Sequence, residues 1–272
     1  MSEQREASKA PEDSGLLLID EHIEESHDDE GRKVRHRGVY LLPNLFTTAN
    51  LFAGFFAIIN AVNGRFEVAA IAVFVAMLMD GFDGRVARMT NTQSAFGAEY
   101  DSLSDLVAFG LAPALLAYEW ALRDLGNVGL GISFVFVACA ALRLARFNTQ
   151  IGKVDKRWFI GLASPAAAGV IAGAVWALHE LGSAGGELSY GVIVPFGVLT
   201  AVVGLLMVSN VKYHSFKDLD LKGRVPFIVL LAIVLVIAVV SVDAARVLLL
   251  IFLVYAVSGP IQFALGRKSV AE

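Results

Sequence analysis

Long apolar runs separated by short charged segments constrain the fold of this chain more than any other feature. Hydrophobic residues make up 56% of the sequence, and its mean hydropathy is +0.64, far above the values of soluble globular domains. About 20 consecutive apolar residues cross a bilayer as a helix, because a helix satisfies its own backbone hydrogen bonds in lipid. The chain is therefore predicted to be an all-α, polytopic membrane helix bundle.

Eight apolar runs approach that length. The predicted spans are residues 45–62, 67–82, 102–121, 128–147, 160–178, 190–209, 226–242 and 246–265. Pro165 is expected to kink the fifth span, because a proline inside a helix removes a backbone donor. Residues 1–38 are rich in Asp and Glu and have no apolar core, so this tail is predicted to be mostly disordered.

The basic residues are distributed unevenly between the two ends of the predicted spans. If the N-terminus is cytoplasmic, 19 of the 22 Lys and Arg residues lie in inside segments, and only Arg65, Arg123 and Arg246 lie outside. Lys and Arg concentrate in the short cytoplasmic loops of membrane proteins. This distribution predicts a multi-pass protein of the inner (cytoplasmic) membrane with a cytoplasmic N-terminus.

Four aspartates interrupt the apolar pattern within 26 residues. Asp80 and Asp83 end the second span, and Asp101 and Asp105 begin the third, so that each pair shares one helix face with Cβ atoms about 5–6 Å apart. The short segment 89–100 is expected to make the two helices antiparallel neighbours. Four carboxylates would then converge at the cytoplasmic face, where ionisable groups in a membrane helix usually mark a functional site.

Such carboxylates repel one another and take up protons unless a cation neutralises them. Their oxygens suit Mg²⁺ or Mn²⁺, and four of them suffice for two ions about 3.5–4 Å apart. Asp80, Asp83, Asp101 and Asp105 are therefore the predicted metal ligands, and two ions at a membrane surface suit a diphosphate substrate. For either pair alone, the alternative is a helix cap or a solvated charge.

The residues between the aspartates fit a nucleotide diphosphate. Gly84 and Ala87 keep the helix face beside the carboxylates small, so that a flat ligand can approach the backbone. Arg88 can hold a phosphate through its planar guanidinium group, and Gly97 is expected to ease the turn into the third helix. The alternative for the small residues is close packing between membrane helices.

The pattern D-G-x2-A-R-x8-G-x3-D-x3-D begins at Asp83, three residues after Asp80. It resembles the signature of the CDP-alcohol phosphotransferase family. The resemblance implies a six-helix catalytic core, placed here at residues 39–209, and leaves residues 210–272 as two additional transmembrane helices with a C-terminal tail. It also implies a homodimer.

The same resemblance implies a role for each residue of the signature. The implied metal ligands are Asp80, Asp83 and Asp101. Asp105 lies near the second metal in this family and acts as the general base. The implied nucleotide- and diphosphate-binding residues are Gly84, Ala87, Arg88 and Gly97.

Stretches outside the signature are similar to the bacterial phosphatidylserine synthase subfamily, at residues 43–47, 104–110, 142–148 and 164–165. Arg143 and Arg146 are three residues apart at the end of the fourth span and could receive a serine carboxylate or a phosphate. With Asn148 they form the predicted acceptor site, although the two arginines could also be only positive anchors. Asn44 and Thr47 either contact the nucleotide or cap the first helix.

The subfamily resemblance implies transfer of the phosphatidyl group of CDP-diacylglycerol to L-serine, with release of CMP and with the acyl chains left in the bilayer. One alternative is a related enzyme that uses choline or glycerol 3-phosphate. A second alternative is a cation transporter, which the position of the acids at one membrane face disfavours. No nucleic-acid partner is expected.

Overall fold

The computed structural model describes residues 26–27, 33–34, 41–90, 95–150, 158–182, 188–214, 238 and 240–268. The chain divides into two compact units, residues 1–38 and 39–272. In the first unit the described residues form a minimal antiparallel pair of strands, β1 (Ser26–His27) and β2 (Lys33–Val34). Most of the tail that the sequence predicts to be disordered lies outside the described residues.

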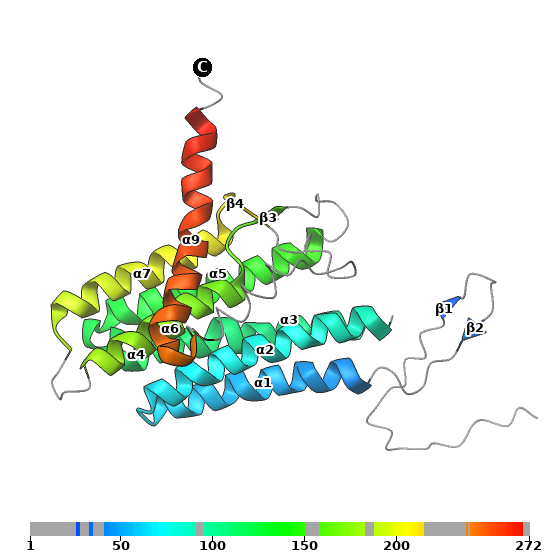
Figure 1. Cartoon of the computed structure of the whole chain (residues 1–272), viewed down its shortest axis with the longest axis horizontal. Helices are drawn as coiled ribbons and strands as arrows, with labels where there is room; N and C mark the ends of the chain where they lie inside the picture. Colours follow the sequence, from blue (N-terminus) through cyan, green and yellow to red (C-terminus); the bar gives the residue numbers. More distant parts are fainter. Residues whose placement is uncertain are drawn as a thin grey trace, which may run out of the picture. The chain divides into compact units, whose positions relative to one another are not determined.

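The described part of the second unit consists almost entirely of helices (Figure 1). In chain order its elements are α1 (Leu41–Val62), α2 (Phe66–Thr90), α3 (Ala95–Asp105), the π-helix η1 (Leu106–Leu111), α4 (Ala112–Trp120), the 3₁₀-helix η2 (Leu122–Leu125), α5 (Asn127–Gln150), β3 (Trp158–Ile160), α6 (Ser164–Gly182), α7 (Tyr190–Val208), β4 (Lys212–His214) and α9 (Ala244–Lys268).

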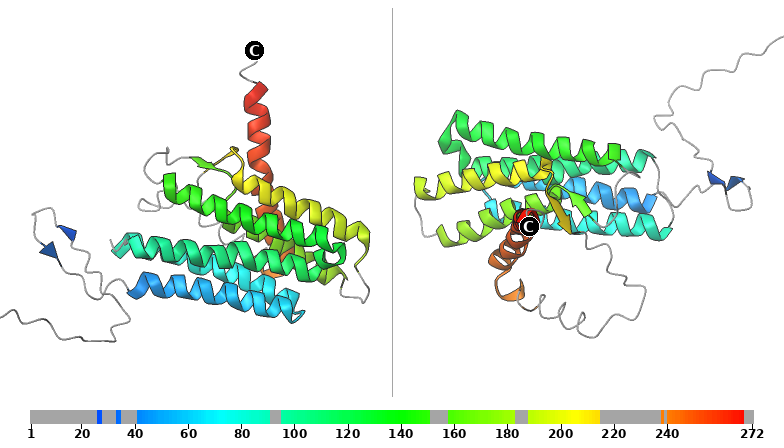
Figure 2. Two further views of the ribbon diagram at one scale, coloured as in Figure 1. Left: turned by 180° about the vertical axis from the view of Figure 1, so that it is seen from behind. Right: turned by 90° about the horizontal axis from the view of Figure 1, so that it is seen from above.

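Helices α1 and α2 form a tight hairpin and lie side by side in both figures (Figures 1 and 2). Ala53, Ala57 and Ala61 are buried at every fourth residue of α1, and such small side chains let two membrane helices approach closely. Gly64 has a φ of 73° in the connecting turn, a left-handed conformation that glycine adopts without steric cost. The opposite side of α1 exposes large apolar side chains such as Phe52 and Phe56, as expected of a lipid-facing surface.

The third predicted span is one continuous helical segment, α3–η1–α4, and it packs against α1. The remaining long helices pair as α5 with α7 and α6 with α9. The short strands β3 and β4 are antiparallel, with Trp158 opposite His214, and they join the segment before α6 to the segment after α7.

Helix α9 packs closely against α6 at two glycines of α6. An added Cβ at Gly169 would lie 2.7 Å from the ring of Phe252, and one at Gly173 would lie 3.0 Å from Cα of Leu249. Tyr213 of β4 is fully buried, and its hydroxyl donates a hydrogen bond of 3.0 Å to the carbonyl oxygen of Ala256. These contacts join the C-terminal helix to the rest of the unit.

The all-α membrane bundle predicted from the sequence is confirmed. Among the described residues, four helices can cross a membrane by length and composition, at Asn44–Val62, Asn127–Thr149, Tyr190–Val208 and Ala244–Ala264. The second and third spans carry the acidic residues and are less uniformly apolar. The predicted span 226–242 lies mostly outside the described residues, which include only 238 and 240–242 of it.

Two local predictions are wrong. Pro165 does not kink the fifth span, because α6 begins at Ser164 and the proline lies in its first turn, where backbone N–H groups have no acceptor within the helix. Gly97 does not form a turn before the third helix, because α3 already begins at Ala95.

Candidate active site

Helix α1 brings the two acidic helices together. It packs along α2 and also against α3 and η1. Direct packing between the second and third spans comes mainly from η1 and α4, which contact α2. The end of α2 and the facing part of α3 therefore pack little against each other directly, and their carboxylates lie in the space between them.

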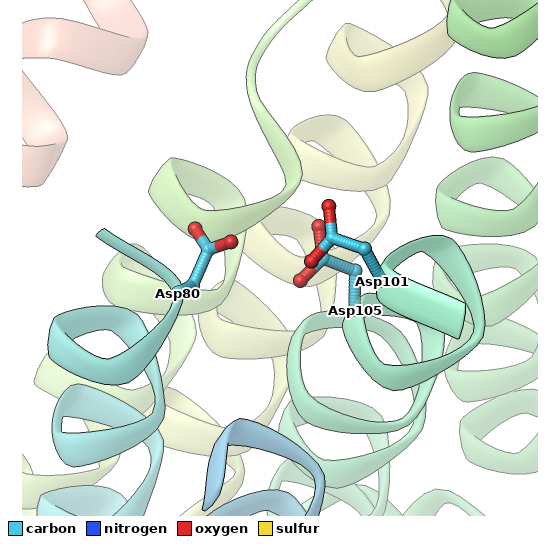
Figure 3. Close-up of side chains that lie close together, drawn as sticks. All are labelled: Asp80, Asp101 and Asp105. Atoms are coloured by element: carbon cyan, nitrogen blue, oxygen red, sulfur yellow. The ribbon is translucent and has the colours of Figure 1, made fainter. Parts of the chain in front are cut away.

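Three of the four predicted metal ligands form one group. Asp80 on α2 and Asp101 and Asp105 on α3 each offer a carboxylate oxygen, and these oxygens lie within 4.8 Å of one another. Figure 3 shows the three side chains extending from facing helices toward a common space. Carboxylate oxygens arranged in this way suit a hard divalent cation.

Asp83 lies beside this group rather than in it. Its side chain is 7% exposed, and its carboxylate accepts a hydrogen bond from the hydroxyl of Thr47 on α1. The structure therefore brings three of the four predicted ligands together and gives the fourth a protein partner.

Two of the aspartates lie just outside the predicted spans, Asp83 after residues 67–82 and Asp101 before residues 102–121. Burial raises the pKa of Asp83, while the hydrogen bond from Thr47 lowers it. Burial, followed by the charges of Asp83 and Asp80, raises the pKa of Asp101 to about 7. Carboxylates behave in this way when they are crowded together without a positive charge.

The donor set passes a further test of fit for a metal ion. Oδ1 of Asp101 is buried and has no hydrogen-bond partner among the described residues. An unpaired buried carboxylate oxygen is costly, and coordination of a cation would satisfy it. Asp80, Asp101 and Asp105 are therefore the residues that could hold a divalent ion.

Asn50 is a site residue that the sequence interpretation missed. It is fully buried on α1, and its Nδ2 donates a hydrogen bond of 3.0 Å to Oδ1 of Asp105. A signal was present in the sequence, because Asn44, Thr47 and Asn50 recur every third residue in a mostly apolar helix. This spacing places polar groups on one face of α1.

Asn44 and Thr47 are not helix caps. Helix α1 begins at Leu41, so both residues lie within the helix and not at its N-cap. The carbonyl oxygen of Asn44 accepts a hydrogen bond from Thr48, whose hydroxyl also lies 3.0 Å from the hydroxyl of Tyr100 on α3. The cap interpretation is excluded, and contact with the nucleotide stays a prediction.

The predicted nucleotide-binding residues lie on the two acidic helices. Gly84 is exposed on α2, and a Cβ added there would meet no atom within 4 Å, so there is room beside the aspartates. Gly97 is half-buried on α3. Ala87 and Arg88 belong to α2, but their side chains lie outside the described residues.

The three predicted acceptor residues, all on α5, point to different partners. Nη1 of Arg143 donates a hydrogen bond of 3.0 Å to Oγ of Ser164, at the start of α6. Arg146 donates to the carbonyl oxygen of Val208 and to Oδ1 of Asn210, at the end of α7. Asn148 exchanges hydrogen bonds with Ser102 on α3.

Of these three residues, Arg143 is the one that interacts electrostatically with the acidic group. Its guanidinium lies within electrostatic range of Asp105, and its buried Nε has no partner among the residues that the structure describes. An unpaired buried guanidinium donor is available for an anionic ligand. Arg146, in contrast, uses its guanidinium group for hydrogen bonds that connect the end of α5 to the end of α7.

A π-helix follows Asp105 directly, at η1. Such segments are rare and occur often at functional sites. Within η1, Ala108 lies so close to α1 that a Cβ added to Gly54 would be 2.7 Å from its Cα. This close contact of the π-helix with α1 sets the distance between α1 and Asp105, the residue just before the π-helix.

Comparison with known proteins agrees with this geometry. A family profile described as CDP-alcohol phosphatidyltransferase matches residues 40–208. The chain belongs to this family. The resemblance of the aspartate signature is thus confirmed, as is the prediction of an enzyme of phospholipid biosynthesis.

Curated relatives of this chain carry more specific names. A CDP-diacylglycerol–serine O-phosphatidyltransferase of Helicobacter pylori is 38% identical over 222 residues, covering 80% of this chain and 90% of the relative. A protein of the same name from Methanocaldococcus jannaschii is 33% identical over 230 residues, covering 85% and 98%. An archaetidylserine synthase of Methanothermobacter thermautotrophicus is 34% identical over 174 residues, covering 63% and 69%.

Proposed function

We propose that this CDP-alcohol phosphatidyltransferase transfers the phosphatidyl group of CDP-diacylglycerol to L-serine, giving phosphatidylserine and CMP. The grouping of Asp80, Asp101 and Asp105 between two facing helices carries the proposal. Two relatives that match most of this chain are named CDP-diacylglycerol–serine O-phosphatidyltransferase, and this name supports serine as the acceptor.

The acidic residues would hold two Mg²⁺ or Mn²⁺ ions, with Asp83 as the fourth ligand beside the group of three. When bound, such ions neutralise a diphosphate and the charge that develops on the departing CMP. Gly84 leaves room for the cytidine, and the proposed diphosphate and nucleotide contacts come from Arg88, Gly97, Ala87, Asn44 and Thr47.

Asp105 accepts the proton of the serine hydroxyl. As the proton leaves, the serine oxygen forms a bond to the lipid-side phosphorus, and the bond from that phosphorus to CMP breaks, with the electron pair leaving on CMP. The serine hydroxyl is a weak nucleophile at neutral pH, so positioning supplies much of the rate. Arg143, with its unpaired Nε, holds the carboxylate of serine.

The proposal includes the cellular arrangement. The protein spans the inner membrane with its N-terminus and active site on the cytoplasmic side, as the distribution of basic residues indicates. Two copies form a homodimer. Residues 39–209 are the catalytic core, and residues 210–272 are an addition to it.

An acceptor panel tests the proposal. Purified protein with CDP-diacylglycerol and Mn²⁺ or Mg²⁺ should release CMP with serine, but not with choline, inositol or glycerol 3-phosphate. EDTA should stop the release, and added Mg²⁺ or Mn²⁺ should restore it. Preference for another alcohol would replace serine while leaving the family intact, and ion flux in liposomes without CMP release would favour a transporter.

A further inference from the structure

Asn50 is a fully buried polar residue in an apolar helix. Burial of an amide is costly unless its hydrogen bonds are satisfied. Its Nδ2 atom is satisfied by Oδ1 of Asp105, 3.0 Å away on another helix. Its Oδ1 atom is buried and has no partner within the part of the chain that the structure describes.

The orientation of this amide follows from its partner. An ionised carboxylate only accepts hydrogen bonds, so the NH₂ end of Asn50 must face Asp105. Oδ1 of Asp105 is thereby held against α1, while the same carboxylate offers an oxygen to the group that it forms with Asp80 and Asp101.

We propose that Asn50 is a positioning residue that holds the Asp105 carboxylate in the orientation required for metal binding and proton transfer. The inference rests on the proposed function only for the identity of the reaction. Residues that hydrogen-bond to a metal-binding side chain typically contribute about 10- to 100-fold to metal affinity or activity. Thr47 donates a hydrogen bond to Asp83 from the same helix, so α1 provides one donor to each acidic helix.

The test compares Asn50→Leu with a matched control, Asn60→Leu. Asn60 lies on the same helix and is also buried, but its Nδ2 donates to the carbonyl oxygen of Phe56 in its own helix. Leucine keeps the volume and removes the donor in both variants. Asn50→Ala and Asn60→Ala provide a second pair if the leucine variants do not fold.

Two quantities are measured, the affinity of the substrate-free protein for Mn²⁺ by electron paramagnetic resonance, and the steady-state kinetics. Replacement of Asn50 should weaken Mn²⁺ binding and lower kcat by about 10- to 100-fold each, with little change in the KM for serine. Replacement of Asn60 should change neither quantity more than about twofold. Equal effects of the Asn50 and Asn60 variants would overturn the proposal.

A double-mutant cycle shows whether Asn50 acts through Asp105. In an Asp105→Asn background, Asn50→Leu should cause no further loss of Mn²⁺ affinity, because residues that act through one contact are not additive. An undiminished loss in that background would contradict the positioning role. Because Mn²⁺ binding is measured without substrates, this result does not depend on which alcohol the enzyme uses.

Discussion

At the scale of single residues, the four aspartates have different surroundings although the sequence presents them as two similar pairs. Asp105 accepts a hydrogen bond from Asn50, and Asp83 accepts one from Thr47. Asp101 keeps an oxygen without a partner among the described residues. These differences arise because α1 contacts each acidic helix at a different place, and they allow the aspartates to perform different tasks.

Asp105→Asn should abolish turnover while largely preserving the binding of CDP-diacylglycerol. The amide keeps the size of the side chain but cannot accept the proton of the acceptor hydroxyl, and loss of a general base typically costs about 10²- to 10⁴-fold in rate. CMP release and binding of the lipid to the purified protein measure the two effects.

Asp124→Asn, at an exposed position on η2, is the control and should behave as the unmodified protein. Normal CMP release by Asp105→Asn would remove Asp105 from its role as the base.

At the scale of elements, the closest approach of α1 to the third span depends on Gly54. A Cβ at this position would lie 2.7 Å from Cα of Ala108 in the π-helix η1, closer than any ordinary carbon–carbon contact. Gly54 is one helical turn from Asn50. The close spacing of α1 and η1 that this glycine permits therefore also places Asn50 within hydrogen-bond distance of Asp105.

Gly54→Ala should therefore destabilise the protein by about 1–3 kcal/mol, the usual cost of overpacking, and should also lower CMP release. Thermal unfolding in detergent measures the first effect. Gly131→Ala on α5 is the matched control, because a Cβ there meets no atom within 4 Å. In that helix alanine is favoured over glycine, so this variant should be at least as stable as the parent, and an equal loss in both variants would argue against the close approach.

At the scale of the whole molecule, the proposed orientation places η2 on the outer side of the inner membrane and β4 on its cytoplasmic side. Asp124 of η2 and Lys212 of β4 are both exposed, and the buried Cys139 is the one cysteine of the sequence. In a Cys139→Ser background, a membrane-impermeant thiol reagent applied to intact cells should label Asp124→Cys and leave Lys212→Cys unlabelled.

The same reagent should label both variants after the cells are permeabilised. Labelling of Lys212→Cys alone in intact cells would require the inverted topology. That result would also place the aspartates on the side away from cytoplasmic serine and CDP-diacylglycerol synthesis, in conflict with the proposed function.

The sequence by itself determined the membrane helix bundle, the position of the acidic pairs on their helices and the family of the enzyme. These features depend on local order: a helix long enough to cross lipid is a continuous apolar run, and residues three or four apart share a face. The errors at Pro165 and Gly97 concern helix boundaries, where local patterns are less decisive than the packing of neighbouring helices.

Only the tertiary structure decided which side chains meet. Asn50 and Asp105 are 55 residues apart in the chain, and Arg146 is 62 residues from Val208. No spacing rule links such residues, because their contacts depend on how α1 packs against α3 and α5 against α7. That packing separated Arg143, beside the acidic group, from Arg146, which joins two helix ends, and it placed a buried amide against Asp105.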